Sequence, residues 1–163
     1  MITEDPKVLA RELSLAGLGG WLVLVGLGLC LAPLRLLAVM AANATAFQPD
    51  VWGVLTTPGT DAYHPLWAPV IIGEIIANLF LLGLSLVNLY LFFRKRRVFP
   101  RMAITFLAAG VVITALDLLA AQAIPMAKVA PKDVAQLGQT VVGAAVWIPY
   151  FLRSRRVRET FVR

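Results

Sequence analysis

Four long apolar runs constrain this chain more than any other feature of its sequence. They cover residues 18–39, 67–93, 102–124 and 133–152 of a 163-residue chain that is 60% hydrophobic. A helix needs about 20 apolar residues to cross roughly 30 Å of hydrocarbon, and each run is near or above that length. Spanning β-strands alternate apolar and polar residues, which none of the runs does. The sequence therefore predicts an all-α integral membrane protein with four transmembrane helices in one domain, residues 1–163.

The basic residues are distributed unevenly around these runs. Most of them lie in residues 1–17, 94–101 and 153–163, and the formal net charge is +6. The positive-inside rule then places these segments in the cytoplasm and the connections 40–66 and 125–132 outside. We expect an antiparallel four-helix bundle with both termini inside (N-in/C-in). The basic clusters should contact anionic lipid head groups rather than nucleic acid, through Arg94, Lys95, Arg96, Arg97, Arg153, Arg155, Arg156 and Arg158.

Polar residues interrupt the apolar runs at a similar expected depth. Arg35, Glu74, Asp117 and Thr140 each lie four to seven residues inside the outer end of their run. Charges in lipid are costly, so such residues face other helices or a wet cavity. Helix rise places the two carboxylates about 10 Å and Arg35 about 6 Å below the outer end, so the three groups can meet. A carboxylate left unpaired there would take up a proton. The candidate intramembrane polar site comprises Arg35, Glu74, Asn78, Asp117, Gln139 and Thr140.

The run 67–93 carries a polar stripe with helical spacing. Its members are separated by four, three, four and three residues, which predicts one face turned away from lipid: Glu74, Asn78, Leu81, Ser85 and Asn88. The third run has a matching stripe in Gly110, Thr114, Asp117 and Ala121. The fourth has one in Gln136, Thr140, Gly143, Trp147 and Tyr150.

Catalytic and cofactor chemistry finds little support in the sequence. Cys30 and His64 are the only cysteine and the only histidine. Dithiol exchange needs paired thiols, and bis-histidine haem ligation from one chain needs two histidines. Two carboxylates alone would bind a metal weakly. We expect no catalytic residue, no metal and no cofactor, although whether the chain is an enzyme stays open.

Three functions remain as alternatives. The first is a non-enzymatic accessory or scaffold protein, with a membrane-protein partner or as a homo-oligomer, in which the polar group is a satisfied ion pair that fixes helix register. The second is a small proton-coupled or polar-solute transporter that uses Arg35, Glu74 and Asp117. The third is a lipid-modifying membrane enzyme, which has only His64 in its favour.

Two sequence blocks resemble a known family. The opening block is Gly17-Leu18-Gly19-Gly20-Trp21-Leu22, followed by Pro33-Leu34-Arg35. The closing block is Trp147-Ile148-Pro149-Tyr150-Phe151, followed by Ser154, Arg156-Val157 and Thr160-Phe161. They are similar to the bacterial family catalogued as domain of unknown function 2569. The resemblance implies a multi-pass inner-membrane protein and no activity. Its signature positions include Trp21, Trp147, Pro149, Tyr150 and Ser154.

The segments outside the runs carry further expectations. Asp5 and Pro6 fit either a short interfacial helix before the first run or a solvated segment that leads into it. The aromatic residues of 40–66 favour a partly ordered lid at the outer interface. Pro149 should kink or end the last helix. The tail after it should follow the cytoplasmic leaflet with Val157 and Phe161 in the lipid, or serve as a docking peptide.

Overall fold

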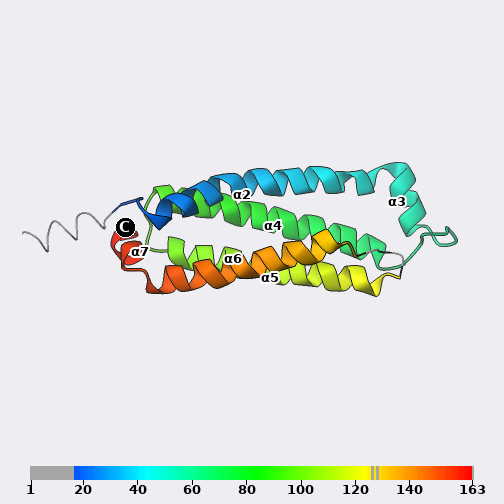
Figure 1. Ribbon diagram of the computed structural model, residues 1–163. Coiled ribbons are helices and arrows are strands. Elements are labelled where there is room, and N and C mark those ends of the chain that lie inside the picture. Colours follow the sequence, from blue (N-terminus) through cyan, green and yellow to red (C-terminus); the bar gives the residue numbers. More distant parts are fainter. Residues whose placement is uncertain (1–16, 126, 128, 163) are drawn as a thin grey trace, which may run out of the picture.

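The computed structural model describes residues 17–125, 127 and 129–162 of the chain, and the elements within them are helices. The long helices are α2 (Trp21–Asn43), α4 (Trp67–Phe93), α5 (Phe99–Ala123) and α6 (Pro131–Arg153). The short ones are η1 (Ala44–Phe47), α3 (Pro49–Thr56) and α7 (Arg155–Thr160). Figure 1 shows the long helices side by side along one axis. The predicted all-helical architecture is confirmed.

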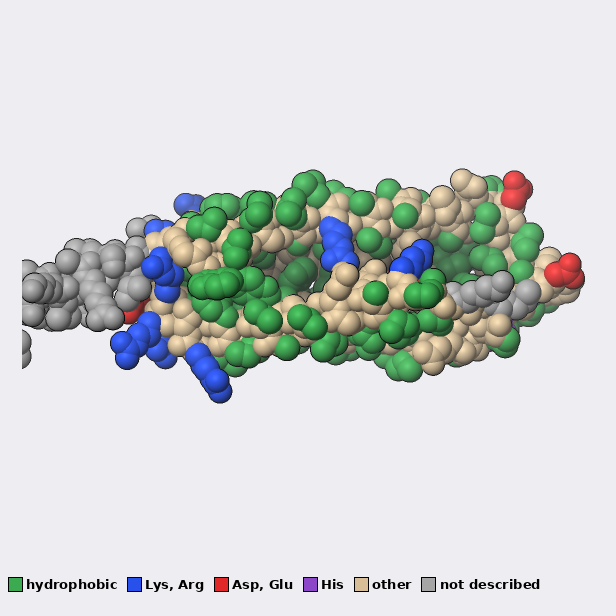
Figure 2. Space-filling model, in the orientation of Figure 1, with side chains coloured by type: hydrophobic (Ala, Val, Ile, Leu, Met, Phe, Trp, Pro, Cys, Tyr) green, Lys and Arg blue, Asp and Glu red, His purple; other side chains and the backbone are tan. Residues whose placement is uncertain are grey.

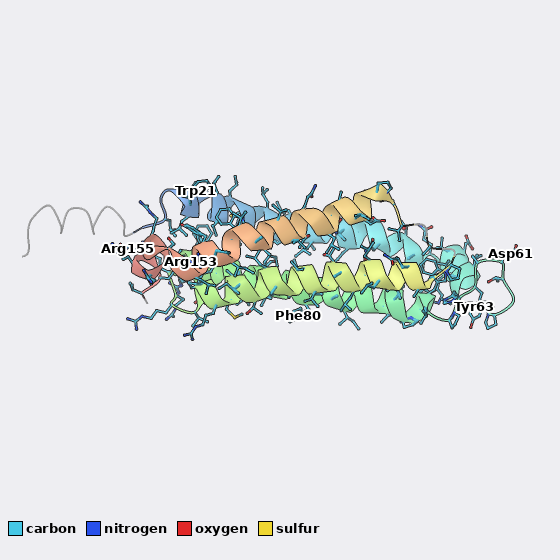
Figure 3. The ribbon with its side chains drawn as sticks, turned by 60° about the horizontal axis from the view of Figure 1, so that its bottom comes forward. Trp21, Asp61, Tyr63, Phe80, Arg153 and Arg155 are labelled. Carbon is cyan, nitrogen blue, oxygen red and sulfur yellow. The ribbon has the colours of Figure 1, made fainter. Side chains whose placement is uncertain are left out.

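The two ends of the molecule differ in composition. One end carries α7 and the connection between α4 and α5, and Figure 2 shows Lys and Arg side chains gathered there. Figure 3 places Arg153 and Arg155 at this end, and Asp61 and Tyr63 at the other, beside α3. We call these the basic end and the α3 end.

Helix boundaries follow the apolar runs closely. α4 has the predicted bounds, while α5 begins three residues early and α6 two residues early. Each of these early starts has a proline in its first turn, Pro100 in α5 and Pro131 in α6. A proline is tolerated there because the N–H it lacks has no partner within the helix. The Asp133 carboxylate accepts a hydrogen bond from the Ala130 backbone N–H at 2.8 Å, which completes the start of α6.

The predicted bounds of the first helix differ most from those in the structure. α2 begins at Trp21 rather than residue 18 and continues to Asn43, four residues past the predicted end. Met40, Ala41 and Ala42 are good helix formers, so nothing local ends the helix at Val39. Pro33 lies buried inside α2. The helix predicted around Asp5 and Pro6 falls outside the described residues.

Three of the helical segments in the described part of the chain are long and apolar enough to cross a membrane. They are Trp21–Phe47, Trp67–Phe93 and Phe99–Ala123. Four spans were predicted, and the fourth, α6, is as long as α2 but less apolar. The difference comes from its polar residues, among them Gln136, Gln139 and Thr140.

The hydrophobic core lies at the basic end. Phe92 and Phe99 are 2% and 0% exposed, and their rings meet edge to face with centroids 5.2 Å apart. Phe99 also contacts Phe151 at 5.7 Å and Phe161 at 4.5 Å. Leu22 of α2 is fully buried in the same cluster. Such aromatic pairs bury large areas and prefer these offset or edge-on geometries.

The opening and closing blocks of the sequence pack against each other at this end. The Thr160 hydroxyl donates to the Gly17 carbonyl at 3.1 Å, and the Gly17 N–H lies 3.2 Å from the same oxygen. The Arg156 guanidinium covers Gly19 and Gly20, and a Cβ on Gly19 would lie 2.8 Å from its Nη1. Gly20 has φ +58°, which favours glycine, and it precedes the first turn of α2.

The tail after α6 is therefore part of the core. Val157 and Phe161 are 1% and 4% exposed. The prediction that they dip into lipid was wrong, because the aromatic cluster offers them a closer apolar surface. Pro149 lies inside α6, which continues to Arg153. After α6, the Ser154 hydroxyl accepts a hydrogen bond from Val157 N at 3.4 Å and caps the start of α7.

The connection predicted as 40–66 is largely helical. Its first four residues belong to the end of α2, and η1 and α3 follow. Phe47 and Trp52 stack with centroids 5.3 Å apart and a 15° angle between their planes. This packing explains why so aromatic a connection is ordered, while its action as a lid stays a prediction.

Candidate binding cavity among the long helices

The polar stripe of α4 faces the inside of the molecule, as predicted. Asn78, Leu81, Ser85 and Asn88 are buried, with exposures between 0% and 8%. Toward the basic end, the side chains of the stripe bond to nearby backbone. Ser85 Oγ donates to Leu82 O at 2.8 Å, and Asn88 Nδ2 reaches Leu84 O at 2.8 Å and Met102 O of α5 at 3.3 Å. The stripe there joins two helices.

Toward the α3 end, the same stripe borders a cavity. The cavity has a volume of about 660 Å³ and is lined by residues of α2, α4, α5 and α6. Figure 2 shows the surface of the molecule hollowed along its middle on one face. The six residues of the candidate polar site all line this cavity: Arg35, Glu74, Asn78, Asp117, Gln139 and Thr140. Volumes of about 300–1,000 Å³ are typical of small-molecule sites.

Each long helix contributes at least one polar side chain to the cavity wall. Arg35 comes from α2 and Asp117 from α5, while α6 supplies Gln136, Gln139 and Thr140. The Thr140 hydroxyl donates to Gln136 O at 2.8 Å. Its oxygen still has lone-pair capacity toward the cavity, because a hydroxyl donates one hydrogen bond and accepts up to two.

Glu74 has a hydrogen-bond partner that the sequence did not suggest. Asn43 Nδ2 donates to Glu74 Oε1, which joins the last residue of α2 to α4. The prediction missed Asn43 because it ended the helix at Val39. The good helix formers after Val39 were the signal for a longer helix.

The expected meeting of one guanidinium with two carboxylates is only partly realised. Arg35, Glu74 and Asp117 share the cavity, but among the described residues no ion pair joins Arg35 to either acid. Glu74 pairs instead with Asn43, which lies eight residues after Arg35 on α2 and about 12 Å farther along the helix axis. Arg35 and Glu74 therefore lie at different levels along the helices, although both line the cavity.

The charges of the cavity are arranged by sign. Glu74 of α4 and Asp117 of α5 both line the cavity. Arg35 is exposed on the α2 side. Charges inside a membrane are normally paired or face water, and they mark ligand and ion pathways. This arrangement offers acceptors for a cation on α4 and α5 and a donor for an anion on α2.

Metal and nucleophile chemistry gain no support from the geometry. In the described part of the chain, no group of three or more His, Cys, Asp or Glu side chains could hold a metal ion. His64 lies in the turn before α4, where its Nδ1 accepts a hydrogen bond from Leu66 N at 3.3 Å. That bond is a local turn contact.

The basic residues predicted to contact lipid head groups divide into two groups. Arg156 packs on the opening glycines, Arg97 Nε donates to Val162 O, and Arg94 lies 5.6 Å from the centroid of the Tyr90 ring. These three stabilise the fold in addition to any contact with lipid. Side chains that are exposed at the basic end include Arg96, Arg153, Arg155 and Arg158.

The family-like signature residues lie near the basic end. Trp21 and Trp147 meet edge to face at 6.5 Å, which brings α2 and α6 together, and Trp147 contacts Tyr150 at 5.7 Å. Ser154 separates α6 from α7. The signature therefore marks the packed end of the molecule rather than the cavity.

Comparison with known proteins agrees with the resemblance noted in the sequence. The family described as protein of unknown function (DUF2569) matches residues 15–162. Searches of the curated proteins and of the solved structures gave no significant match. The family match covers almost all of the chain, from the opening glycines to the buried tail. The chain therefore belongs to the DUF2569 family of proteins of unknown function.

Proposed function

We propose that the chain is a multi-pass protein of the bacterial inner membrane and that α6 is its fourth span. At about 1.5 Å per residue, its 23 residues reach about 34 Å, enough for the hydrocarbon core. Three of its polar residues, Gln136, Gln139 and Thr140, line the cavity. It also exposes large apolar side chains: Val134, Val141, Val142, Val146 and Leu152. An amphipathic span of this kind is less apolar on average than one surrounded by lipid.

The proposed orientation puts the basic end in the cytoplasm, where its exposed arginines would contact anionic head groups. Labelling of intact cells with a membrane-impermeant maleimide tests it, using single cysteines in a Cys30→Ala background. Asp61→Cys at the α3 end should react from outside, and Arg155→Cys should react only after the cells are opened. The reverse pattern would invert the topology, and reaction of both from outside would remove α6 as a span.

The function that the geometry supports best is binding of a small polar solute in the membrane, as a carrier. One observation supports it above all: the six candidate polar residues, which come from all four long helices, line a single cavity. A scaffold has no need of such a cavity. The role of accessory protein would regain support if the cavity residues proved purely structural.

Stability separates a binding site from a structural ion pair. Removing one partner of a buried ion pair typically costs about 3–5 kcal/mol. In a binding site whose acids belong to no ion pair, Glu74→Gln and Asp117→Asn should change the free energy of unfolding by less than about 1 kcal/mol, or increase it. Unfolding in mixed detergent micelles measures the difference. A loss of several kcal/mol in both variants would favour the structural role.

Transport is tested in proteoliposomes that contain a pH-sensitive dye. Solutes from a panel of amino acids, amines and organic acids are added outside, and coupled proton movement is followed. Wild-type protein should respond to at least one solute class, and Glu74→Gln and Asp117→Asn should abolish the response. Phe80→Ala is the control, because Phe80 is exposed and lies outside the cavity. Equal flux in wild type and both cavity variants would contradict the proposal.

A further inference from the structure

The long helices do not all pack against their neighbours to the same extent, and we call the boundary between two neighbouring helices a seam. Among the described residues, extended contacts join α2 to α4, α4 to α5 and α5 to α6, but no such interface joins α2 to α6. These two helices meet near the basic end through Trp21 and Trp147. Figure 2 shows the surface hollowed along the middle of the molecule, where Figure 1 places the seam between α2 and α6. The cavity is therefore open sideways, toward the position of the lipid chains.

The wall of the cavity combines apolar and charged surface in a pattern that suits an amphiphile. Most of its lining residues are apolar, and Leu31, Leu36 and Val39 come from the α2 side of the open seam. Gly28 and Gly143 face the cavity, and a Cβ on either would meet nothing within 4 Å. The seam thus has both the apolar surface and the room that an alkyl chain needs.

The charges define the head group. An ammonium group has three N–H donors, and Glu74, Asp117 and Thr140 provide oxygen acceptors in the cavity wall from α4, α5 and α6. Arg35 of α2 lines the same cavity, and its guanidinium offers the fork of donors that phosphate prefers. A head group with an ammonium and a phosphate satisfies both kinds of group.

We propose that the cavity binds a phospholipid with a primary ammonium head group, which enters through the seam between α2 and α6. The phosphate contacts Arg35, the ammonium group lies between Glu74 and Asp117, and the acyl chains leave through the seam into the bilayer. The inference rests on the proposed solute-binding function and names its ligand class. A trimethylated ammonium head group lacks N–H donors and an unmodified glycerol head group lacks the cation, so both should bind more weakly.

Native mass spectrometry of the purified protein tests this with three lipids of equal chain composition. Phosphatidylethanolamine should bind at least about tenfold tighter than phosphatidylcholine or phosphatidylglycerol, the ratio expected for one charge-assisted hydrogen bond. Glu74→Gln and Arg35→Gln should each weaken it roughly tenfold. Gly143→Leu should abolish it by filling the cavity. Gly138→Leu is its matched control, since Gly138 is in the same helix but outside the cavity.

Several results would overturn the proposal. Equal binding of the three lipids, or binding that Gly143→Leu leaves unchanged, would mean that the lipid contacts the outer surface only. Free phosphoethanolamine binding as tightly as the lipid would remove the role of the seam and retain the polar-solute site. If no lipid or solute binds and both acid-to-amide variants unfold, the proposed function fails as well. Arg94→Gln, at the basic end, should leave the lipid preference intact.

Discussion

The two halves of α4 carry similar polar residues in different surroundings. At the basic end, Ser85 and Asn88 are fully buried and bonded to backbone carbonyls, beside the aromatic cluster. At the α3 end, Glu74 and Asn78 border a cavity of about 660 Å³. The same stripe thus packs against other residues in one half of the molecule and borders a cavity in the other. Stability should therefore depend mainly on the basic end, and ligand binding on the cavity.

The largest loss of stability is expected for Phe99→Ala. Phe99 is 0% exposed and contacts three other phenylalanine rings, so its removal leaves a cavity in the core. Substitutions of this type cost about 3–5 kcal/mol. Unfolding in mixed micelles measures the effect, and Phe80→Ala is the control because its ring is 55% exposed. A loss below about 1 kcal/mol for Phe99→Ala would show that the aromatic cluster is not the stable core.

The two asparagines of the stripe provide the next comparison. Asn88→Ala removes the bonds to Leu84 O and to Met102 O, and should cost about 1–2 kcal/mol. Asn78→Ala lies at the cavity, where its amide has no such pair of carbonyl partners, and should cost less than about 1 kcal/mol. Measured free energies of unfolding should preserve this order. Equal costs would mean that the two halves are packed alike.

The sequence predicted the stripe but not the difference between its halves. Helical spacing places Asn78 and Asn88 on one face, and the face is buried as expected. Whether a buried helix face packs against an aromatic ring or borders a cavity depends on residues that are far away in the sequence. Phe161, the residue after α7, packs against Phe99, and no periodicity in α4 or α5 encodes that contact.

The end of α2 shows a second limit of the sequence. The apolar run ends at Val39, but the helix ends at Asn43. The residues after Val39 still favour a helix, although they are less apolar than the run. The candidate polar residues were still brought to one cavity, since burial of charge in a membrane leaves few other places for them. The free-energy cost of charge in lipid therefore predicted that these residues lie near one another. Which of them form hydrogen bonds depends on the fold.

A smaller loss is expected when the contact between the first and last described segments is cut. Thr160→Val removes the hydroxyl that bonds Gly17 N and Gly17 O while keeping the shape of the side chain. Leaving these partly buried backbone groups without the hydroxyl should cost about 1 kcal/mol. Thr105→Val is the control, because the Thr105 hydroxyl bonds within its own helix and is exposed. Hydrogen exchange of the Gly17 amide should rise in the Thr160→Val variant alone.

The smallest effects, of opposite sign, are expected at two glycines of α2. A Cβ on Gly26 would lie 3.0 Å from the Phe92 ring, whereas a Cβ on Gly28 would meet nothing within 4 Å. Phe92 is confined by the aromatic cluster and has little room to move, so Gly26→Ala should destabilise the protein by about 1 kcal/mol. Gly28→Ala should stabilise it by roughly 0.5–1 kcal/mol, because alanine restricts the unfolded chain and favours the helix. Both variants carry the same chemical change two residues apart, so helix propensity contributes equally to each. The sign of the difference in unfolding free energy therefore reports packing alone, and stabilisation by both substitutions would refute the contrast between a packed basic end and an open cavity.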